Sequence, residues 1–109
     1  MICEAWDIIA VPFPFTDRAA HKRRPALVLS SRTFNQHGHT LLAMIASSSF
    51  PWPGGRSIKD LVSAGLSTPC VVRLKLFTLD NRLMIRRIGH LAPEDRNHVI
   101  VELQTILPL

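Results

Sequence analysis

Prolines and glycines divide the first half of this chain into short apolar runs. The runs 6-WDIIAV-11, 25-PALVLSS-31 and 40-TLLAMIASS-48 are short and rich in aliphatic residues, which favours strands over helices. The first run leads into 12-PFPFTD-17, whose two prolines cannot donate to a strand ladder. In the second run the apolar residues are continuous rather than alternating, so we expect a strand that is buried on both faces.

The second half of the chain predicts a basic hairpin and a short helix. The segments 70-CVVRLKLF-77 and 82-RLMIRRIGHL-91 mix apolar with basic residues, and 78-TLDN-81 lies between them. We therefore expect these two segments to pair as a β-hairpin. Residues 58–65 predict a short helix that ends at Gly65, a residue suited to a C-terminal cap.

The last segment, 92–107, is the strongest helix prediction. It begins with a proline followed by two acidic residues, which suit the first turn of a helix. The segments 32–39 and 49–55 are polar or rich in proline and glycine, and they predict a turn and a loop. About five strands and one terminal helix, with no internal repeat, indicate a mainly β fold built as a small, strongly bent sheet or barrel.

Length and composition point to one domain with an anionic partner. The 109 residues are 47% hydrophobic, which is enough for one core, and we treat residues 1–109 as a single domain. The 13 Lys and Arg residues outnumber the 8 Asp and Glu residues and give a net charge of +5. This balance favours nucleic acid or an acidic protein segment as the partner.

The chain has only two cysteines, and it has no apolar stretch of the length that crosses a membrane. Cys3 and Cys70 have neither the number nor the spacing of a disulfide or zinc framework. We therefore expect reduced packing residues, no metal and no cofactor. Glu4 and Asp7 interrupt the N-terminal segment, which does not have the pattern of an export signal, so we expect a cytoplasmic protein with no membrane contact.

Six stretches, spread over nearly the whole chain, carry a resemblance to a known family. They are 6-WDIIAVPFPFTD-17, 23-RRPALVLS-30, 42-LAMI-45, 52-WPGG-55, 64-AGLSTPCVVRLK-75 and 89-GHL-91. Each stretch is weak alone, but their order and spacing resemble the PemK/MazF family of toxins from type II toxin–antitoxin modules. The arginine–proline pair that leads into an apolar strand is the most characteristic part of the match.

The resemblance implies a fold, an activity and partners. The implied fold is an SH3-like small barrel that forms a homodimer, with a C-terminal helix. The implied activity is cleavage of single-stranded RNA (mRNA) at short sequence motifs without a metal, and a cognate antitoxin protein would hold the toxin inactive. In this family the 2′-hydroxyl attacks the adjacent phosphate, which leaves a 2′,3′-cyclic phosphate and a 5′-hydroxyl.

The resemblance places the active-site arginine of the family at Arg24, immediately before Pro25. A guanidinium stays protonated and can hold two phosphate oxygens at once, so we expect it to stabilise charge rather than abstract a proton. An arbitrary arginine at this place would more often be a solvated residue on a strand edge. Lys22 and Arg23 are expected to attract RNA through its phosphates without specifying its sequence.

The family threonine at the end of the third strand is replaced here by Ala46. A methyl group cannot bond a phosphate or the attacking hydroxyl, so either Ser47 or Ser48 substitutes for the threonine, or activity is reduced or lost. Strand alternation points Ser47 away from the face of Ala46 and returns Ser48 to it. We therefore favour Ser48, with Ser47 as the alternative, while a strand end without any role remains equally open.

Five further residues are candidates for RNA binding. Arg73 matches an arginine that some relatives use near the site, and Lys75 stands where some relatives carry an aspartate. Asp17 and His21 lie in the loop before Arg24, and an exposed Trp52 could stack on a base. The alternatives are a solvated face for Arg73 and a lid over the barrel for Trp52.

Ala46 and Lys75 also motivate a second functional hypothesis. A catalytically degenerate relative would keep the dimer and the antitoxin groove but would not cleave RNA. A third branch of the superfamily inhibits DNA gyrase on the same barrel. The Arg24–Pro25 pair argues against that branch, because gyrase inhibition in that branch does not depend on this arginine.

Overall fold

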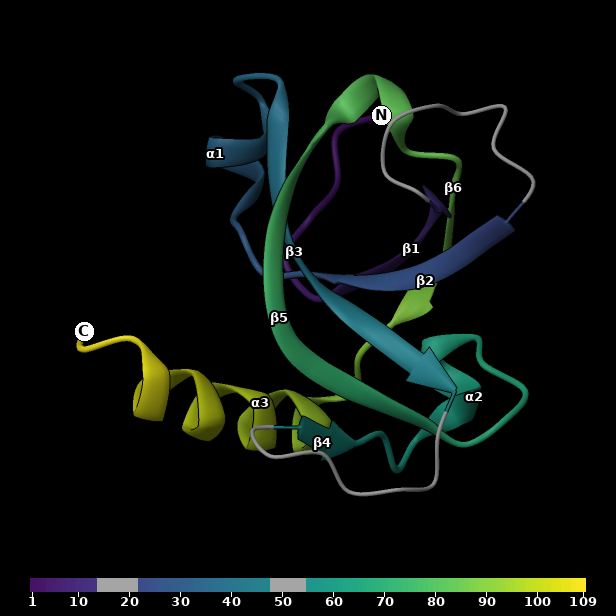
Figure 1. The fold of residues 1–109 in the computed structure, drawn as a ribbon, viewed down its shortest axis with the longest axis vertical. Helices are drawn as coiled ribbons and strands as arrows, with labels where there is room; N and C mark the ends of the chain where they lie inside the picture. Colours follow the sequence, from purple (N-terminus) through teal and green to yellow (C-terminus); the bar gives the residue numbers. More distant parts are fainter. Residues whose placement is uncertain (14–21, 48–54) are drawn as a thin grey trace.

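The computed structural model describes residues 1–13, 22–47 and 55–109. Within these ranges the backbone forms strands, short helices and one longer helix at the C-terminal end (Figure 1). In chain order the elements are β1 (Asp7–Phe13), β2 (Lys22–Val28), α1 (Arg32–Asn35), β3 (His39–Ser47), β4 (Gly55–Ser57), α2 (Leu61–Ala64), β5 (Cys70–Asp80), the 3-10 helix η1 (Asn81–Leu83), β6 (Arg86–His90) and α3 (Pro93–Ile106).

The strands form one antiparallel sheet in the order β4-β5-β3-β2-β1-β6. A bulge in β5 bends this sheet, because the partner in β5 changes from Leu76 at Ala43 to Arg73 at Met44, and the register skips two residues. Figure 1 shows β5 as one long, strongly curved strand. The expected mainly β fold, with a bent sheet and a C-terminal helix, is confirmed.

Helices cover the two edge strands of the sheet. α2 packs against β6, where Gly89 lies so close to Ala64 that an added Cβ would come within 2.3 Å of the Ala64 carbonyl carbon. α3 contacts β4 at the other edge, and Figure 1 shows the two elements side by side. Helix packing therefore stabilises both edges of the sheet. At β6 this packing requires a glycine at position 89, because any larger residue would clash with α2.

The two faces of the sheet each bury an apolar cluster. Ile8 and Leu27 belong to one cluster and their neighbours Ile9 and Ala26 to the other, as strand alternation requires. The first core contains the buried residues Ile8, Leu27, Ala43, Ile45, Ile58, Ala64, Cys70, Val72, Leu91 and Val99. The second core contains Cys3, Ile9, Val11, Ala26, Val28, Leu42, Leu79 and Met84.

These two cores explain the unbroken apolar runs of the sequence. A strand between two cores needs an apolar side chain at every position, and Ala26, Leu27 and Val28 are all buried. The expected burial of this strand on both faces is confirmed. Cys3 and Cys70 are free, buried thiols in different cores, so their predicted role as packing residues is confirmed as well.

The predicted basic hairpin is wrong. β5 continues through Asp80 and so includes most of the connection expected at 78–81, and it pairs with β3 and β4. β6 pairs instead with β1 at the opposite edge of the sheet. The mixed apolar and basic pattern that the two segments share does not identify the partner of either strand.

Several predicted boundaries also differ from the structure. β2 begins at Lys22 rather than at Pro25, because its pairing with β1 extends to Phe13↔Lys22. The predicted turn at 32–39 contains α1, which the Ser31 side chain caps by accepting a hydrogen bond from the backbone N–H of Phe34. The segment expected to stop regular structure ends in a strand, since β4 begins at Gly55.

The two predicted helices of the second half are confirmed. α2 begins at Leu61 rather than at residue 58, and it is capped at its C-terminal end by Gly65, which adopts the left-handed conformation with φ of 72°. α3 begins with Pro93 and carries Glu94 and Asp95 in its first turn. Asp95 is buried, and its carboxylate accepts hydrogen bonds of 2.9 Å from the backbone N–H groups of Lys59 and Asp60. One carboxylate therefore attaches the segment between β4 and α2 to α3.

Replacing Asp95 with Ala should lower the free energy of unfolding by about 2 kcal/mol, because two backbone N–H groups lose their acceptor. Urea denaturation of the two proteins measures the difference. Glu94→Ala is the matched control: Glu94 is exposed and lies 3.8 Å from Lys59, and an exposed pair of this kind contributes less than about 1 kcal/mol. Equal losses in the two variants would contradict the anchoring role of Asp95.

Candidate active site

Arg24 lies on β2 with its guanidinium held against an aromatic ring. It is half-buried, pairs with Val11 of β1, and its guanidinium carbon lies 4.9 Å from the centre of the Phe13 ring. A cation over an aromatic face at this distance is attracted by the ring. The side chain is thus positioned before any ligand binds, as its strand position predicts.

The strand register places a second arginine on the same face of the sheet. Arg24 is two residues from Ala26, Ala26 lies opposite Met44, and Met44 lies opposite Arg73 of β5. Antiparallel partners project to the same face, and so do residues two apart in a strand. Arg24 and Arg73 therefore share the second-core face, separated by β3, so their strands lie about 10 Å apart.

Ala46 occupies the same face near the end of β3. It is half-buried, lies two residues beyond Met44 and pairs with Val71. Its neighbour Ser47 pairs with Cys70, which belongs to the first core, so Ser47 projects to the opposite face. The sidedness that alternation predicts for Ser47 is confirmed, and this hydroxyl does not lie on the face of Arg24.

The other predicted cations divide between the two faces. Lys22 shares the face of Arg24, whereas Arg23 pairs with Pro12 and projects to the opposite side. Both are exposed. Lys75 is exposed as well and lies in the bulged part of β5, two residues from Arg73. The four remaining candidates, Asp17, His21, Ser48 and Trp52, fall outside the described residues.

Four carboxylates in the described part of the chain have partners elsewhere. Asp7 is 3.2 Å from Arg87 and 3.1 Å from His90, and Asp95 binds backbone N–H groups. Glu102 pairs with Arg56, and Asp80 pairs with Arg82, whose hydrogen bonds lower the pKa of Asp80 to about 2. Each of these four carboxylates is thus engaged by a partner other than Arg24, although Asp7 alternates with Ile9 and therefore lies on the same face of β1.

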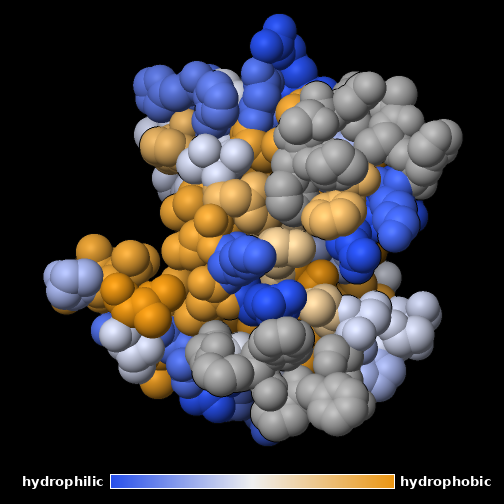
Figure 2. Space-filling model, viewed as in Figure 1, coloured by the Kyte–Doolittle hydropathy of each residue, from blue (hydrophilic) through white to orange (hydrophobic). Residues whose placement is uncertain are grey.

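Apolar surface borders this cationic face. Figure 2 shows an orange area over the curved middle of β5, with hydrophilic groups in blue beside it. Leu74, Leu76 and Phe77 of β5 are only half-buried; Phe77 packs against the second core, and Leu74 and Leu76 pack against the first. β5 therefore presents apolar contact area beside the charge of Arg73, with Phe77 on the same face and Leu74 and Leu76 on the other.

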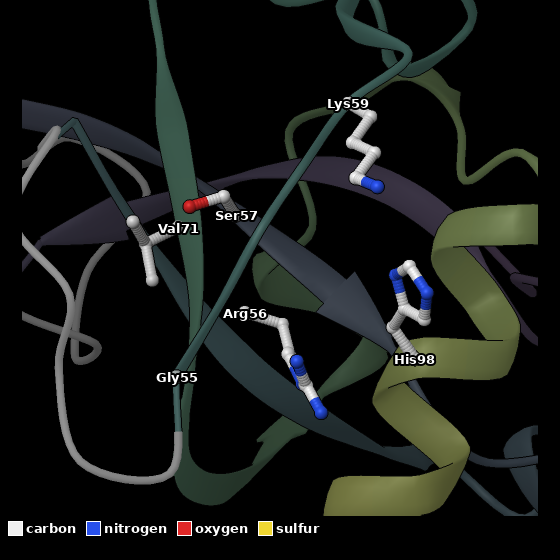
Figure 3. Close-up of a pocket in the computed structure, with 6 residues that line it drawn as sticks. All are labelled: Gly55, Arg56, Ser57, Lys59, Val71 and His98. Carbon is white, nitrogen blue, oxygen red and sulfur yellow. The ribbon is translucent and has the colours of Figure 1, made fainter.

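A pocket at the β4 edge was not predicted from the sequence. It has a volume of about 440 Å³ and is lined by Gly55, Arg56, Ser57, Lys59, Val71 and His98. Figure 3 shows Arg56 and His98 side by side between β4 and α3, with Lys59 pointing toward the same space. The cations within 56–60 were the available signal, but His98 joins them only through the packing of α3. We call this site the β4 pocket.

The described residues offer neither a metal-binding cluster nor a helix suited to a membrane. Across 1–13, 22–47 and 55–109, no group of three or more His, Cys, Asp or Glu side chains is arranged to hold a metal ion. No helix in the same ranges has both the length and the apolar character needed to cross a membrane.

Comparison with known proteins identifies one family. A model described as a PemK-like, MazF-like toxin of type II toxin–antitoxin system matches residues 4–107. A search of curated proteins found no match. The family model covers almost all of the chain, including both strands that carry Arg24 and Arg73.

Solved structures of similar fold come from several bacteria. MazF of Deinococcus radiodurans is 21% identical, with a TM-score of 0.78 over 100% of this chain and 99% of that one. An endoribonuclease in complex with its cognate antitoxin, from a mycobacterial species, is 18% identical, with a TM-score of 0.78 over 98% and 96%. The Mycobacterium tuberculosis toxin MazF-mt6 is 19% identical, with a TM-score of 0.74 over 94% and 97%. At these identities the likeness shows a shared fold.

Proposed function

Because the chain belongs to the family of PemK-like, MazF-like toxins of type II toxin–antitoxin systems, we propose that it is a sequence-specific endoribonuclease. It cleaves single-stranded RNA without a metal, by attack of a 2′-hydroxyl on the adjacent phosphate. The products carry a 2′,3′-cyclic phosphate and a 5′-hydroxyl. The observation that carries this proposal is the pre-positioned Arg24 on a sheet face that also holds Arg73.

Arg24 acts on the phosphate that reacts. As the hydroxyl adds, the phosphorus gains a fifth ligand and its oxygens become more anionic. A planar guanidinium that is already fixed over Phe13 can donate two parallel hydrogen bonds to those oxygens. Donors that need not reorganise during the reaction stabilise the transition state more than the ground state.

The remaining cations bind the RNA on either side of that phosphate. Arg73 and Lys75 lie along β5, and Lys22 lies two residues from Arg24 on the same face. Arg23 projects to the other side of β2 and contributes to attraction at longer range. In the loops, we assign RNA contacts to Asp17, His21 and Trp52, with Trp52 stacking on a base.

A serine hydroxyl replaces the family threonine at Ala46 in this proposal. Ser48 is the favoured residue, because the register directs Ser47 toward the side of Cys70 rather than toward Arg24. The hydroxyl would hold the attacking 2′-hydroxyl or a phosphate oxygen in place. If neither serine acts, Arg24 and the bound geometry provide the catalysis alone.

Ser48→Ala should lower the cleavage rate constant by about tenfold to a hundredfold, because one hydrogen bond to the reacting groups is removed. Ser47→Ala, which removes a hydroxyl from the opposite face, should change it less than about twofold. Single-turnover cleavage of one RNA by both variants measures the difference. Equal rates in the two variants would exclude a substitution of the threonine by Ser48.

The partners and location of the protein follow from the same family assignment. We propose a cytoplasmic homodimer that a cognate antitoxin inhibits. The half-buried apolar residues of β5, seen as the orange area in Figure 2, support a protein contact beside this strand. An antitoxin segment with acidic and apolar residues would suit a surface that offers both cations and apolar area.

Incubation of the purified protein in EDTA with mixed-sequence single-stranded RNA tests the function directly. Fragments that share a sequence motif at their ends and carry cyclic phosphates would support the proposal. Absence of cleavage at high protein concentration, with antitoxin binding intact, would favour the degenerate binding module, for which Ala46 is the specific argument. The EDTA also tests the proposed independence from metal ions.

A further inference from the structure

We infer that the β4 pocket binds a phosphate of the RNA chain a few nucleotides away from the phosphate that is cleaved. This inference rests on the proposed ribonuclease function and adds a second anion site to it. The pocket presents a guanidinium from Arg56, an ammonium from Lys59, an imidazole from His98 and a hydroxyl from Ser57. All four groups can donate hydrogen bonds to phosphate oxygens.

The arrangement of these groups suits a small anion. Figure 3 shows Arg56 and His98 alongside each other and Lys59 directed toward the same space from the far end of the pocket. The groups come from two elements distant in sequence, since His98 lies on α3 and the others lie in or just after β4. Convergence of donors from separate elements is what an anion site requires, whereas isolated surface lysines do not provide it.

The two cations of the pocket have acidic neighbours, which affects their availability. Arg56 bonds Glu102 at 2.9 Å, and Lys59 lies 3.8 Å from Glu94 in a highly exposed pair. Exposed pairs of this kind contribute little, so a phosphate can compete for Lys59. Glu102 engages the Nη2 nitrogen of Arg56, and the Arg56 Nε is buried and has no hydrogen-bond partner among the described residues. The side chain is 42% exposed, so its terminal nitrogens are the donors that a phosphate can reach.

The pocket lies at the edge of the sheet and is lined from both faces, because Ser57 shares the face of Ala46 whereas Arg56 pairs with Val72 of the first core. Gly55 pairs with Arg73, and Ser57 pairs with Val71, which in turn pairs with Ala46. The strand order β2-β3-β5-β4 places three strand spacings, about 14 Å, between Arg24 and the pocket. An RNA strand that crosses the sheet over Arg24 and Arg73 reaches the edge strand β4 next. Because Arg56 projects to the opposite face, the RNA backbone meets its guanidinium by passing around this edge.

RNA fits this pocket better than an acidic protein segment does. Among the described residues of the lining, Val71 is the only aliphatic side chain, and it is buried, so the pocket offers little apolar area to anchor a peptide. Folding of a disordered segment onto a surface depends on such apolar area. A nucleic-acid backbone instead presents phosphates at regular intervals and needs only the donors.

The test compares a short and a long RNA around the mapped cleavage site, each with a 2′-deoxy nucleotide at the attacking position so that neither is cleaved. The variant Arg56→Gln/Lys59→Gln removes both cations of the pocket. Wild type should bind the long RNA about tenfold more tightly than the short one, and the double variant should bind both equally. The slope of log affinity against log salt concentration for the long RNA should fall by about one for each phosphate that the double variant no longer neutralises.

Arg82→Gln is the matched control. Arg82 is an exposed arginine that pairs with Asp80 at 2.8 Å, so this variant removes a comparable ion pair away from the pocket. It should keep the preference for the long RNA. If the double variant keeps the preference too, or if Arg82→Gln abolishes it equally, the inference is overturned. If loss of the Arg56–Glu102 pair prevents the double variant from folding, Lys59→Gln alone replaces it in the test, because Lys59 is exposed. This single variant should weaken the preference for the long RNA.

Two further binding experiments test other occupants of the pocket. Inorganic phosphate is titrated while the imidazole resonances of His98 are followed by NMR, and a decapeptide of glutamate is tested for binding to wild type and to the double variant. Phosphate could perturb the His98 resonances while the preference for the long RNA does not depend on Arg56 and Lys59. That pair of results would indicate a site for free anions and overturn the RNA assignment. A double variant that fails to bind the peptide but keeps the RNA preference would overturn it in favour of an acidic protein.

Failure of this inference can be separated from failure of the proposed function. If wild type binds neither RNA and cleaves none, the ribonuclease function fails. If wild type cleaves RNA and binds both oligonucleotides, but its preference for the long one is independent of Arg56 and Lys59, only the second anion site fails.

Discussion

Arg24→Ala should lower the single-turnover rate constant for RNA cleavage by about a hundredfold to a thousandfold, the range found when a donor to a developing anion is removed. The reason is the position of the guanidinium, which is fixed over Phe13 on the face shared with Arg73. Affinity for a non-cleavable RNA should fall much less, because Arg73, Lys75 and Lys22 still attract the phosphates. The effect therefore belongs mainly to the chemical step.

Two substitutions separate the role of Arg24 from general charge. Arg24→Lys keeps a positive charge but not the planar fork, so it should recover only part of the activity. Arg23→Ala removes a neighbouring cation from the opposite side of β2 and should affect binding at low salt more than the rate constant. A fall of the rate constant in Arg23→Ala as large as in Arg24→Ala would refute a specific role for Arg24, as would cleavage by Arg24→Ala at the wild-type rate.

Local pattern was sufficient for the features that depend on neighbours in sequence. The unbroken apolar residues around Leu27 predict a strand with a core on each side, and the structure contains both cores. Simple alternation also predicts that Ser47 and Ala46 face opposite sides, which the pairing of Ser47 with Cys70 confirms. These inferences need only the period of a strand, which is fixed by backbone geometry.

Features that depend on distant partners were not predicted. β5 and β6 look like a hairpin because 78–81 lies between two similar basic segments, but β5 pairs with β3 and β6 pairs with β1. Choice of partner is set by the packing of the whole sheet, and a short connection does not force two strands together. The β4 pocket was missed for the same reason, since His98 meets Arg56 and Lys59 only when α3 packs beside β4.

Gly89→Ala should have the largest effect on stability among the substitutions considered, with a loss of about 3 kcal/mol in the free energy of unfolding. A Cβ at Gly89 would come within 2.3 Å of the Ala64 carbonyl carbon, 2.4 Å of its carbonyl oxygen and 2.7 Å of the Gly65 nitrogen. All three atoms belong to the backbone, so no side chain can rotate away. α2 must then separate from β6, which should lower the melting temperature by more than about 10 °C in a domain of this size.

Gly38→Ala provides the comparison that assigns this loss to crowding. Gly38 has φ of 110°, so an alanine there is strained by its backbone, but a Cβ would meet nothing within 4 Å. Its cost should be about 1 kcal/mol, the ordinary penalty for an L-residue in this region. Thermal unfolding of both variants measures the two effects on one scale. If Gly89→Ala costs no more than Gly38→Ala, the packing between α2 and β6 is loose, and this edge of the sheet does not depend on it.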